Sequence, residues 1–226
     1  MPSAHPLDRP VWSALTTRQA HLSLGDARAR RFAPDYGLFV AAPDASPESL
    51  AALGALVPAG GRAATLEAEP IPPLAGLYVE PRAGVQMVAQ RPDLTAPAFA
   101  FARLTDADAP RMLALATLTE PGPFFARTHQ LGDFFGVKRD GALVAMAGER
   151  MKPEGFTEVS GVCTHPDHRG RGYAGGLMRV VMAGILARGE TPFLHAYAHN
   201  TGAIALYETL GFEVRRTVTM TMLSRG

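Results

Sequence analysis

The chain has 226 residues, 47% of them hydrophobic and 19% charged, so it can bury a sizeable core and does not have the composition of a disordered protein. Its formal net charge of +1 excludes a broad basic surface for nucleic acid. Its single cysteine, Cys163, excludes an intrachain disulfide, and no stretch approaches the ~18 apolar residues of a membrane span. With a polar, proline-broken N-terminus, the sequence indicates a soluble protein of the cytoplasm.

The first part of the chain is rich in Ala, Pro and Gly and predicts a small α/β region whose role the sequence does not reveal. A helix is expected from Ser46, as N-cap, with Pro47 in its first turn, to the residue before Pro58. Strands are expected at 36–41, 74–79 and 85–89. Because prolines mark the stretch 91–97, we divide the chain into an N-terminal region, 1–96, and a second domain, 97–226.

The second part shows clearer periodicity. Strands are expected at 99–104, 133–139, 142–150, 156–164, 192–198 and 213–223. Helices are expected at 106–118, 124–130, 172–187 and 203–210. Asp140-Gly141 is a strong hairpin signal between two of the strands. The alternation of strands and helices predicts a mixed α/β layer architecture.

A loop rich in glycine and arginine, Arg169-Gly170-Arg171-Gly172-Tyr173-Ala174, joins an expected strand to an expected helix. The first amide groups of a helix are unpaired and lie at the positive end of its dipole, so this position attracts anions. The glycines let backbone amides approach a ligand, and the arginines can bond phosphate oxygens. The loop therefore predicts a pyrophosphate site, with a solvated helix-start turn as the alternative.

Two common nucleotide motifs fit this loop poorly. A P-loop requires Gly-Lys followed by Ser or Thr, and the loop contains no lysine. Gly170, Gly172 and Gly175 match the spacing of the dinucleotide fingerprint, but the next strand ends without the acidic residue that would bind a ribose. A Rossmann-type site is therefore disfavoured.

Arg169-x-x-Gly172-x-Ala174 resembles the acyl-CoA pyrophosphate signature of the GNAT superfamily of N-acyltransferases. The segment from Asn200 to Phe212 resembles that family's second signature, Asn-x-x-Ala-x-x-x-Tyr-x-x-x-Gly-Phe. The resemblance covers about residues 99–223 and is closest to the glycine N-acyltransferase-like branch. It implies an α/β fold with a GNAT-type central mixed sheet flanked by helices. The N-terminal region could be a degenerate half of the same fold.

The resemblance also implies roles for particular residues. The strand end Val162-Cys163-Thr164 would bind the pantetheine arm of acetyl-CoA through its backbone, and the loop from Arg169 to Ala174 would hold the phosphates. Tyr207 would be the general acid for the leaving thiolate, unless its ring only packs under the cofactor. Asn200 would contact the pantetheine or a water, and it could also cap the following helix.

Glu158 is the candidate general base. Side chains alternate along a strand, so positions 158, 160, 162 and 164 are expected to share one face and to place Glu158 in the cleft. The resemblance matches Glu158 to the glutamate base of the histone-directed branch, and a solvent-facing carboxylate is the alternative. Cys163 alternates away from that face and is expected to be a small core residue, not a nucleophile. The nearby histidines lack partners at ligand spacing, so no metal is expected.

These observations predict an N-acetyltransferase that moves the acetyl group of acetyl-CoA directly to a primary amine in a ternary complex. The alternative is a catalytically weak acyl-CoA-binding regulatory module. The acceptor could be a small molecule or a peptide, with residues 119–130 as one wall of its site and the N-terminal region as a cover. No nucleic-acid or membrane partner is expected, and a homodimer remains open.

Overall fold

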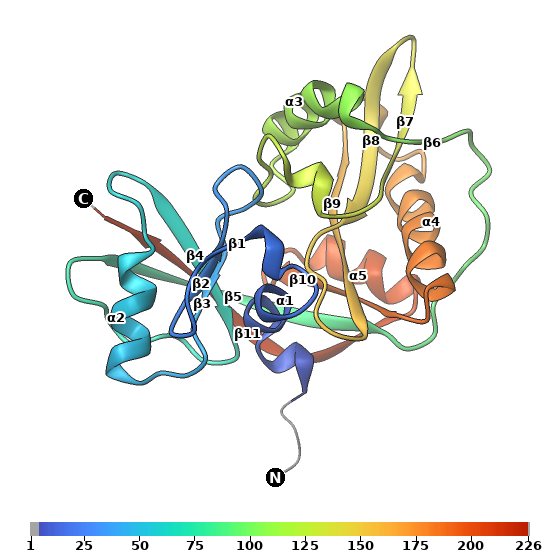
Figure 1. The fold of residues 1–226 in the computed structure, drawn as a ribbon. Helices are drawn as coiled ribbons and strands as arrows, with labels where there is room; N and C mark the ends of the chain where they lie inside the picture. Colours follow the sequence, from blue (N-terminus) through green and yellow to red (C-terminus); the bar gives the residue numbers. More distant parts are fainter. Residues whose placement is uncertain (1–4, 226) are drawn as a thin grey trace.

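The computed structural model describes residues 5–225, and their centre is an eight-stranded mixed sheet (Figure 1). The strand order is β4 (Arg62–Glu67), β11 (Phe212–Ser224), β5 (Tyr78–Ala89), β10 (Thr191–Tyr197), β9 (Phe156–Thr164), β8 (Ala142–Glu149), β7 (Phe134–Arg139) and β6 (Ala102–Arg103). Neighbouring strands are antiparallel except β9 and β10, which are parallel. This architecture confirms the expected α/β class.

Helices cover both faces of the sheet. On one face, α4 (Tyr173–Ala187) and α5 (Thr201–Thr209) pack on a core that includes Leu177, Leu194 and Phe212. The other face carries α1 (Pro10–Thr16) and α3 (Ala109–Thr119), so α3 and α4 lie on opposite sides of β8 (Figure 1). No helix within residues 5–225 is long and apolar enough to cross a membrane.

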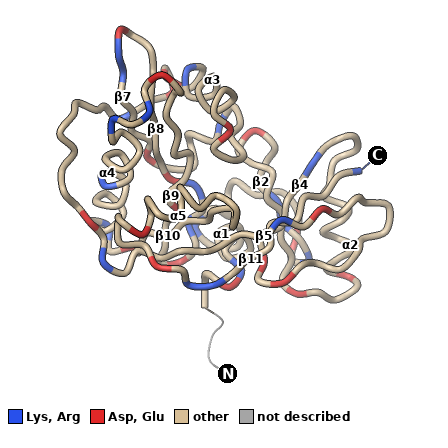
Figure 2. The backbone as a smooth tube through the Cα atoms, turned by 180° about the vertical axis from the view of Figure 1, so that it is seen from behind, with Lys and Arg blue, Asp and Glu red and all other residues tan. Residues whose placement is uncertain are grey.

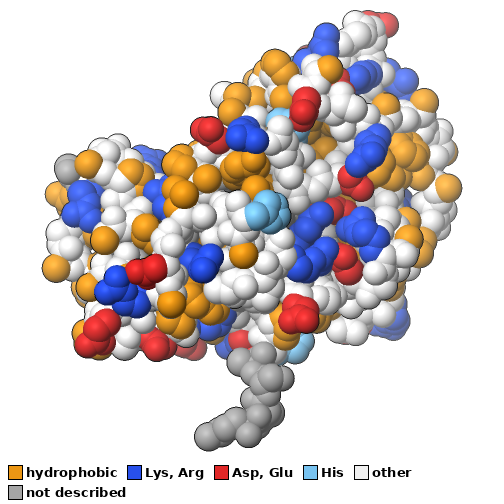
Figure 3. Space-filling model, in the orientation of Figure 1, with side chains coloured by type: hydrophobic (Ala, Val, Ile, Leu, Met, Phe, Trp, Pro, Cys, Tyr) orange, Lys and Arg blue, Asp and Glu red, His pale blue; other side chains and the backbone are white. Residues whose placement is uncertain are grey.

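At the far end of the sheet, α2 (Pro47–Ala55) lies near a small three-stranded sheet of β1 (Ser23–Gly25), β2 (Arg30–Phe32) and β3 (Val40–Ala41). Short 3-10 helices are η1 (Pro6–Asp8), η2 (Ala20–Leu22), η3 (Asp106–Asp108), η4 (Thr128–Leu131) and η5 (Pro166–His168). Basic and acidic residues alternate in short stretches along the backbone (Figure 2), and their side chains are interspersed over the face seen in Figure 3.

Local sequence signals explain the well-predicted elements. Ser46 caps α2 by accepting a bond from the Ser49 amide, and Thr105 forms a capping box with Asp108 before α3. Asp140 and Gly141 both have positive φ, 50° and 81°, as a tight hairpin turn between β7 and β8 requires. Strand β9 has the expected bounds.

Other expectations were wrong in part. The strands expected at 74–79 and 85–89 are one strand, β5, and β4 and α1 were not expected. The strand expected at 99–104 is only β6, and Phe99, outside it, packs edge-on against Tyr173 of α4. The helix expected at 124–130 is only the 3-10 turn η4.

The N-terminal region is built into the same sheet as the rest of the chain. Strand β5, from within 1–96, lies between β10 and β11 and pairs with both. The junction expected near residue 96 therefore falls in a connection between β5 and β6, and it does not divide two sheets.

Candidate active site

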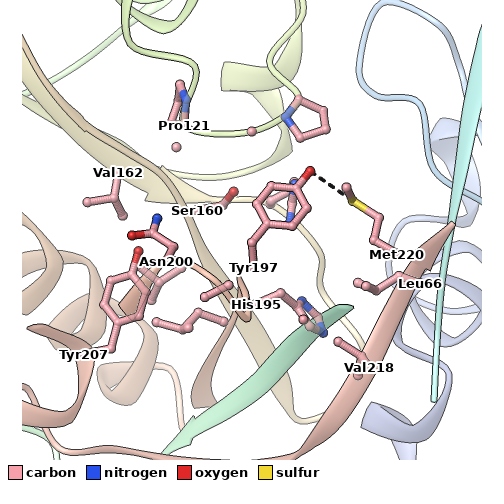
Figure 4. A pocket seen from close by; sticks show the side chains of 18 of the residues that line it. Leu66, Pro121, Ser160, Val162, His195, Tyr197, Asn200, Tyr207, Val218 and Met220 are labelled. Atoms are coloured by element: carbon pink, nitrogen blue, oxygen red, sulfur yellow. Dashed lines mark hydrogen bonds between the residues drawn. The ribbon is translucent and has the colours of Figure 1, made fainter. Parts of the chain in front are cut away.

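A cavity opens where β9 and β10 separate. The two strands are paired only from Phe156 to Glu158, opposite Thr191 to Phe193. Beyond these residues the strands diverge around a cavity of about 110 Å³, and Ser160, Val162, His195 and Tyr197 are among its lining residues (Figure 4). In this stretch each strand keeps its outer neighbour, β8 or β5, and leaves the edge facing the cavity without a strand partner.

A β-bulge in β9 changes which side chains reach this cavity. The register with β8 shifts between Cys163 and Ser160, and Gly161 has φ 63°. Val159 and Val162, three positions apart, both pack with the core beneath α4. The expectation that positions 158, 160, 162 and 164 share a face was therefore wrong, because the extra residue reverses the alternation and puts Glu158 on the opposite face from Val162.

Glu158 is fully buried in a network of charges. Its carboxylate accepts bonds from Arg150 Nε at 2.8 Å and Nη2 at 2.7 Å, and its Oε1 lies 2.8 Å from His195 Nδ1. Burial alone would raise the pKa of Glu158, but Arg150 and His195 outweigh it and hold the pKa at about 2. The carboxylate is thus a permanent anion at neutral pH and a weak proton acceptor. It is not among the side chains that line the cavity.

His195 is held at both ring nitrogens. The Gln86 amide nitrogen lies 3.1 Å from His195 Nε2 and also donates to the Leu7 carbonyl oxygen at 2.9 Å, while Arg215 donates to the other end of the amide. Since the Gln86 nitrogen can only donate, Nε2 accepts and Nδ1 carries the proton that bonds Glu158. This chain of bonds connects η1, at the N-terminal end, to the cavity.

Tyr207 and Asn200 line the same cavity as Val162, close to one another (Figure 4). The Tyr207 hydroxyl has no hydrogen bond to a side chain or backbone group within residues 5–225, and burial raises its pKa, so the phenol is protonated at neutral pH. The Asn200 Oδ1 accepts from the Ala203 amide at 3.2 Å and caps α5. Three of the predicted site residues therefore meet at one cavity.

The predicted phosphate loop is exposed at the start of α4. Gly170 and Gly172 both have φ 73°, a conformation that favours glycine, and Gly172 is the N-cap of the helix. A Cβ at either position would meet nothing within 4 Å, so the space beside these two residues is open. Tyr173 differs from its neighbours because its ring is buried against Phe99. Its hydroxyl accepts a hydrogen bond from Arg139 Nε at 3.2 Å.

The predicted residues Cys163 and Thr164, and His165 beside them, do not line the first cavity. Cys163 is buried in the core beneath α3, where burial raises the pKa of its thiol to about 11. Thr164 ends β9 and its carbonyl accepts a long bond, 3.4 Å, from Arg169 Nε. His165 bonds the Asp167 amide and caps η5. Within residues 5–225 no three His, Cys, Asp or Glu side chains are grouped to hold a metal ion.

A second cavity, of about 820 Å³, adjoins the first. The two share Gly122, Pro123, Tyr197 and Met220 as lining residues. One wall of the second cavity is the loop after α3, which contributes Pro123 and Phe124. Phe125 and Arg127 of the same segment do not line it, and Arg127 stacks on Tyr36 instead. The opposite wall comes from β4, β5 and β11.

Sequence reasoning missed the network around Glu158 and the contribution of the N-terminal region. Phe39, Leu66 and Gly84 line the first cavity although they carry no motif. Tyr197 could have been found, because it shares a strand face with His195 at the end of an expected strand.

Comparisons with known proteins give a consistent result. Residues 135–221 match the model of the FR47-like protein family. A GNAT-family protein from Novosphingobium aromaticivorans is 45% identical, with a TM-score of 0.92 over 99% of this chain and 100% of that chain. Two GCN5-related structures share the fold. The one from Streptococcus suis is 16% identical, with a TM-score of 0.61 over 95% of this chain and 92% of that chain. The one from Kribbella flavida is 18% identical, with a TM-score of 0.61 over 95% of each chain. A comparison with curated proteins found no match.

Proposed function

Because the chain belongs to the GNAT family of acetyltransferases, we propose that it moves the acetyl group of acetyl-CoA to a primary amine by direct transfer in a ternary complex. The observation that carries this proposal is the opening between β9 and β10, with a protonated, unpartnered tyrosine hydroxyl on its wall. Membership of the glycine N-acyltransferase-like branch stays a prediction.

The opening suits an extended acyl-CoA. A pantetheine arm can pair with the free edge of β9 as an added strand does, through the backbone groups near Val162 and Thr164. The first backbone amides of α4, after Gly172, and the side chains of Arg169 and Arg171 then meet the pyrophosphate. Of these loop residues, Tyr173 would contribute its backbone amide, because its ring is buried.

The transfer itself needs an acid and a route for one proton. The amine nitrogen bonds the acetyl carbon, the carbon–sulfur bond breaks, and the leaving thiolate takes a proton from Tyr207. Because the pKa of Glu158 is held at about 2, we assign Glu158 to positioning His195 and Arg150. The amine proton then leaves through water in the cavity beside Ser160 and Tyr197, and water returns a proton to the Tyr207 phenolate.

The second cavity is the proposed acceptor site. It reaches the thioester position through the residues it shares with the first cavity, and its walls join the loop after α3 to the N-terminal region. This gives residues 1–96 a role as one wall of the acceptor site.

Replacing Tyr207 with phenylalanine tests the proposal. Release of CoA thiol in the presence of an amine panel should fall about 100-fold in kcat, the lower range for general acid catalysis, with the KM for acetyl-CoA unchanged. Stability should change little, because the hydroxyl has no protein partner within residues 5–225. If wild-type protein binds acetyl-CoA and no amine raises thiol release above hydrolysis, the chain is a binding module and the transfer proposal fails.

A further inference from the structure

The register of three strands orders the side chains along the floor of the second cavity. Residues directly opposite one another on antiparallel strands point to the same face. Across β4, β11 and β5 the successive rows are Arg62, Ser224 and Tyr78; Ala64, Met222 and Glu80; and Leu66, Met220 and Arg82. The innermost row is Val218, Gly84 and Tyr197 of β10. The rows form a track from the exposed rim at Arg62 to the wall of the first cavity.

The track is long compared with a free amino acid. Val218 and Ser224 are six residues apart on an unbroken stretch of β11, which corresponds to about 20 Å at ~3.4 Å per residue. An extended peptide advances ~3.3–3.6 Å per residue, so about six residues span the same distance. A single amino acid with its amine at the inner end would reach only the nearest row.

Along β4 and β11 the middle of the track is apolar, while β5 carries the Glu80–Arg82 ion pair there. Leu38, Met220 and Met222 line the second cavity, and Leu66 lines the first beside Met220 (Figure 4). Methionine side chains adapt their shape to different apolar partners. This part of the floor can bury apolar side chains of an acceptor without fixing their identity.

The second cavity carries charges of opposite sign on different walls. Arg62, at the rim, has no ion pair within residues 5–225, whereas Arg82 is already paired with Glu80 at 3.0 Å. Glu120, on the opposite wall, also has no ion pair within residues 5–225, and it directly precedes Pro121, which lines the first cavity. Its backbone is left-handed, with φ 47°. The wall next to Pro121 thus offers a negative charge for an ammonium group, and the rim at Arg62 a positive charge for a carboxylate.

We propose that the second cavity binds a short extended peptide, with its N-terminal amine beside Glu120 and Tyr197 and its C-terminal carboxylate at Arg62. This inference rests on the proposed acetyl transfer, because it identifies the peptide amine as the acceptor. It predicts that the preferred length is about six residues and that the carboxylate matters only when the peptide is long enough to reach the rim.

A peptide series tests the inference. Peptides of one, three and six residues with the same N-terminal residue are compared, each as free acid and as C-terminal amide, by CoA thiol release. We expect kcat/KM to rise at least about tenfold from one to six residues, as apolar side chains are buried. At six residues the acid should exceed the amide about fivefold, the upper range for an exposed ion pair. Arg62→Gln should remove that difference, and Arg28→Gln, a remote exposed arginine, should keep it.

Two results would overturn the inference: the same kcat/KM at all lengths, or an equal preference for the acid in wild type and Arg62→Gln. Loss of acetyl transfer is distinguishable, because calorimetric binding of the six-residue acid and amide to the CoA-bound protein does not require turnover. Tighter binding of the acid, lost in Arg62→Gln, supports the peptide site even without transfer. Equal binding of both peptides contradicts it.

Discussion

Substitution of Glu158 by glutamine removes a negative charge that the protein has buried completely. The Glu158 side chain is 0% exposed and that of its partner Arg150 only 12%. Glutamine keeps the volume and can still accept a hydrogen bond, but it cannot balance the guanidinium or hold the His195 proton as strongly. The expected effect is therefore on stability first and on chemistry second.

The magnitude follows from the pKa of the carboxyl. A pKa lowered from 4.5 to about 2 corresponds to about 3 kcal/mol of stabilisation of the folded state at neutral pH. Removing one partner of a buried ion pair costs about 3–5 kcal/mol in other proteins, because the remaining charge stays uncompensated. We expect urea unfolding at pH 7 to show Glu158→Gln less stable by about 3 kcal/mol. Adding Arg150→Met should restore part of the loss.

The pH dependence has a defined sign. The folded pKa of Glu158 lies below its unfolded value, so its stabilisation is complete above about pH 4.5 and is lost as the pH falls towards 2. The difference in stability between wild type and Glu158→Gln should shrink across this window and stay constant above it. An unchanged urea midpoint for Glu158→Gln, together with loss of the ascending limb of its kcat/KM profile, would refute this reasoning and make Glu158 the base.

Two further predictions concern the loop and the cysteine. Gly172→Asp should weaken acetyl-CoA binding at least about tenfold, because a carboxylate enters the anion site and the backbone has φ 73°. Gly60→Asp is the control, because Gly60 has φ 63° in a distant exposed turn and the substitution carries the same strain; this variant should bind acetyl-CoA normally. Equal affinities of the two variants for acetyl-CoA would contradict the loop assignment. Because burial raises the pKa of Cys163 to about 11, iodoacetamide should leave the native protein unmodified at pH 7.5 and modify Cys163 in urea. Mass spectrometry measures this modification. Rapid labelling of the native protein would contradict the burial of Cys163.

The elements beyond residue 130 could be predicted because their signals are local. A cap, a hairpin turn or a helix-ending glycine such as Gly211 acts within a few residues, so the sequence is sufficient to locate it. The meeting of Val162, Asn200 and Tyr207 followed from motifs with fixed spacing. The bulge at Gly161 could not be predicted from alternation alone, and it reversed the expected orientation of Glu158.

The N-terminal region was harder because its structure depends on distant partners. Strand β4 is stabilised by pairing with β11, about 150 residues later in the chain, and β5 by pairing with β10 and β11. The sequence near β5 predicts strand segments but not their partners, and the sequence near β4 predicts no strand. The walls that these strands add to the two cavities were invisible for the same reason.

The position of β5 links the two parts of the chain, because this strand lies between β10 and β11. Its Gln86 lies opposite His195 and carries the hydrogen bonds that link Leu7 to His195 and, through it, to Glu158 and Arg150. Its other end carries Tyr78, Glu80 and Arg82 into the second cavity. A single strand therefore orients the residues beneath the proposed thioester position and forms the floor of the proposed acceptor site. We therefore expect a displacement of β5 to disturb both the proposed thioester position and the proposed acceptor site.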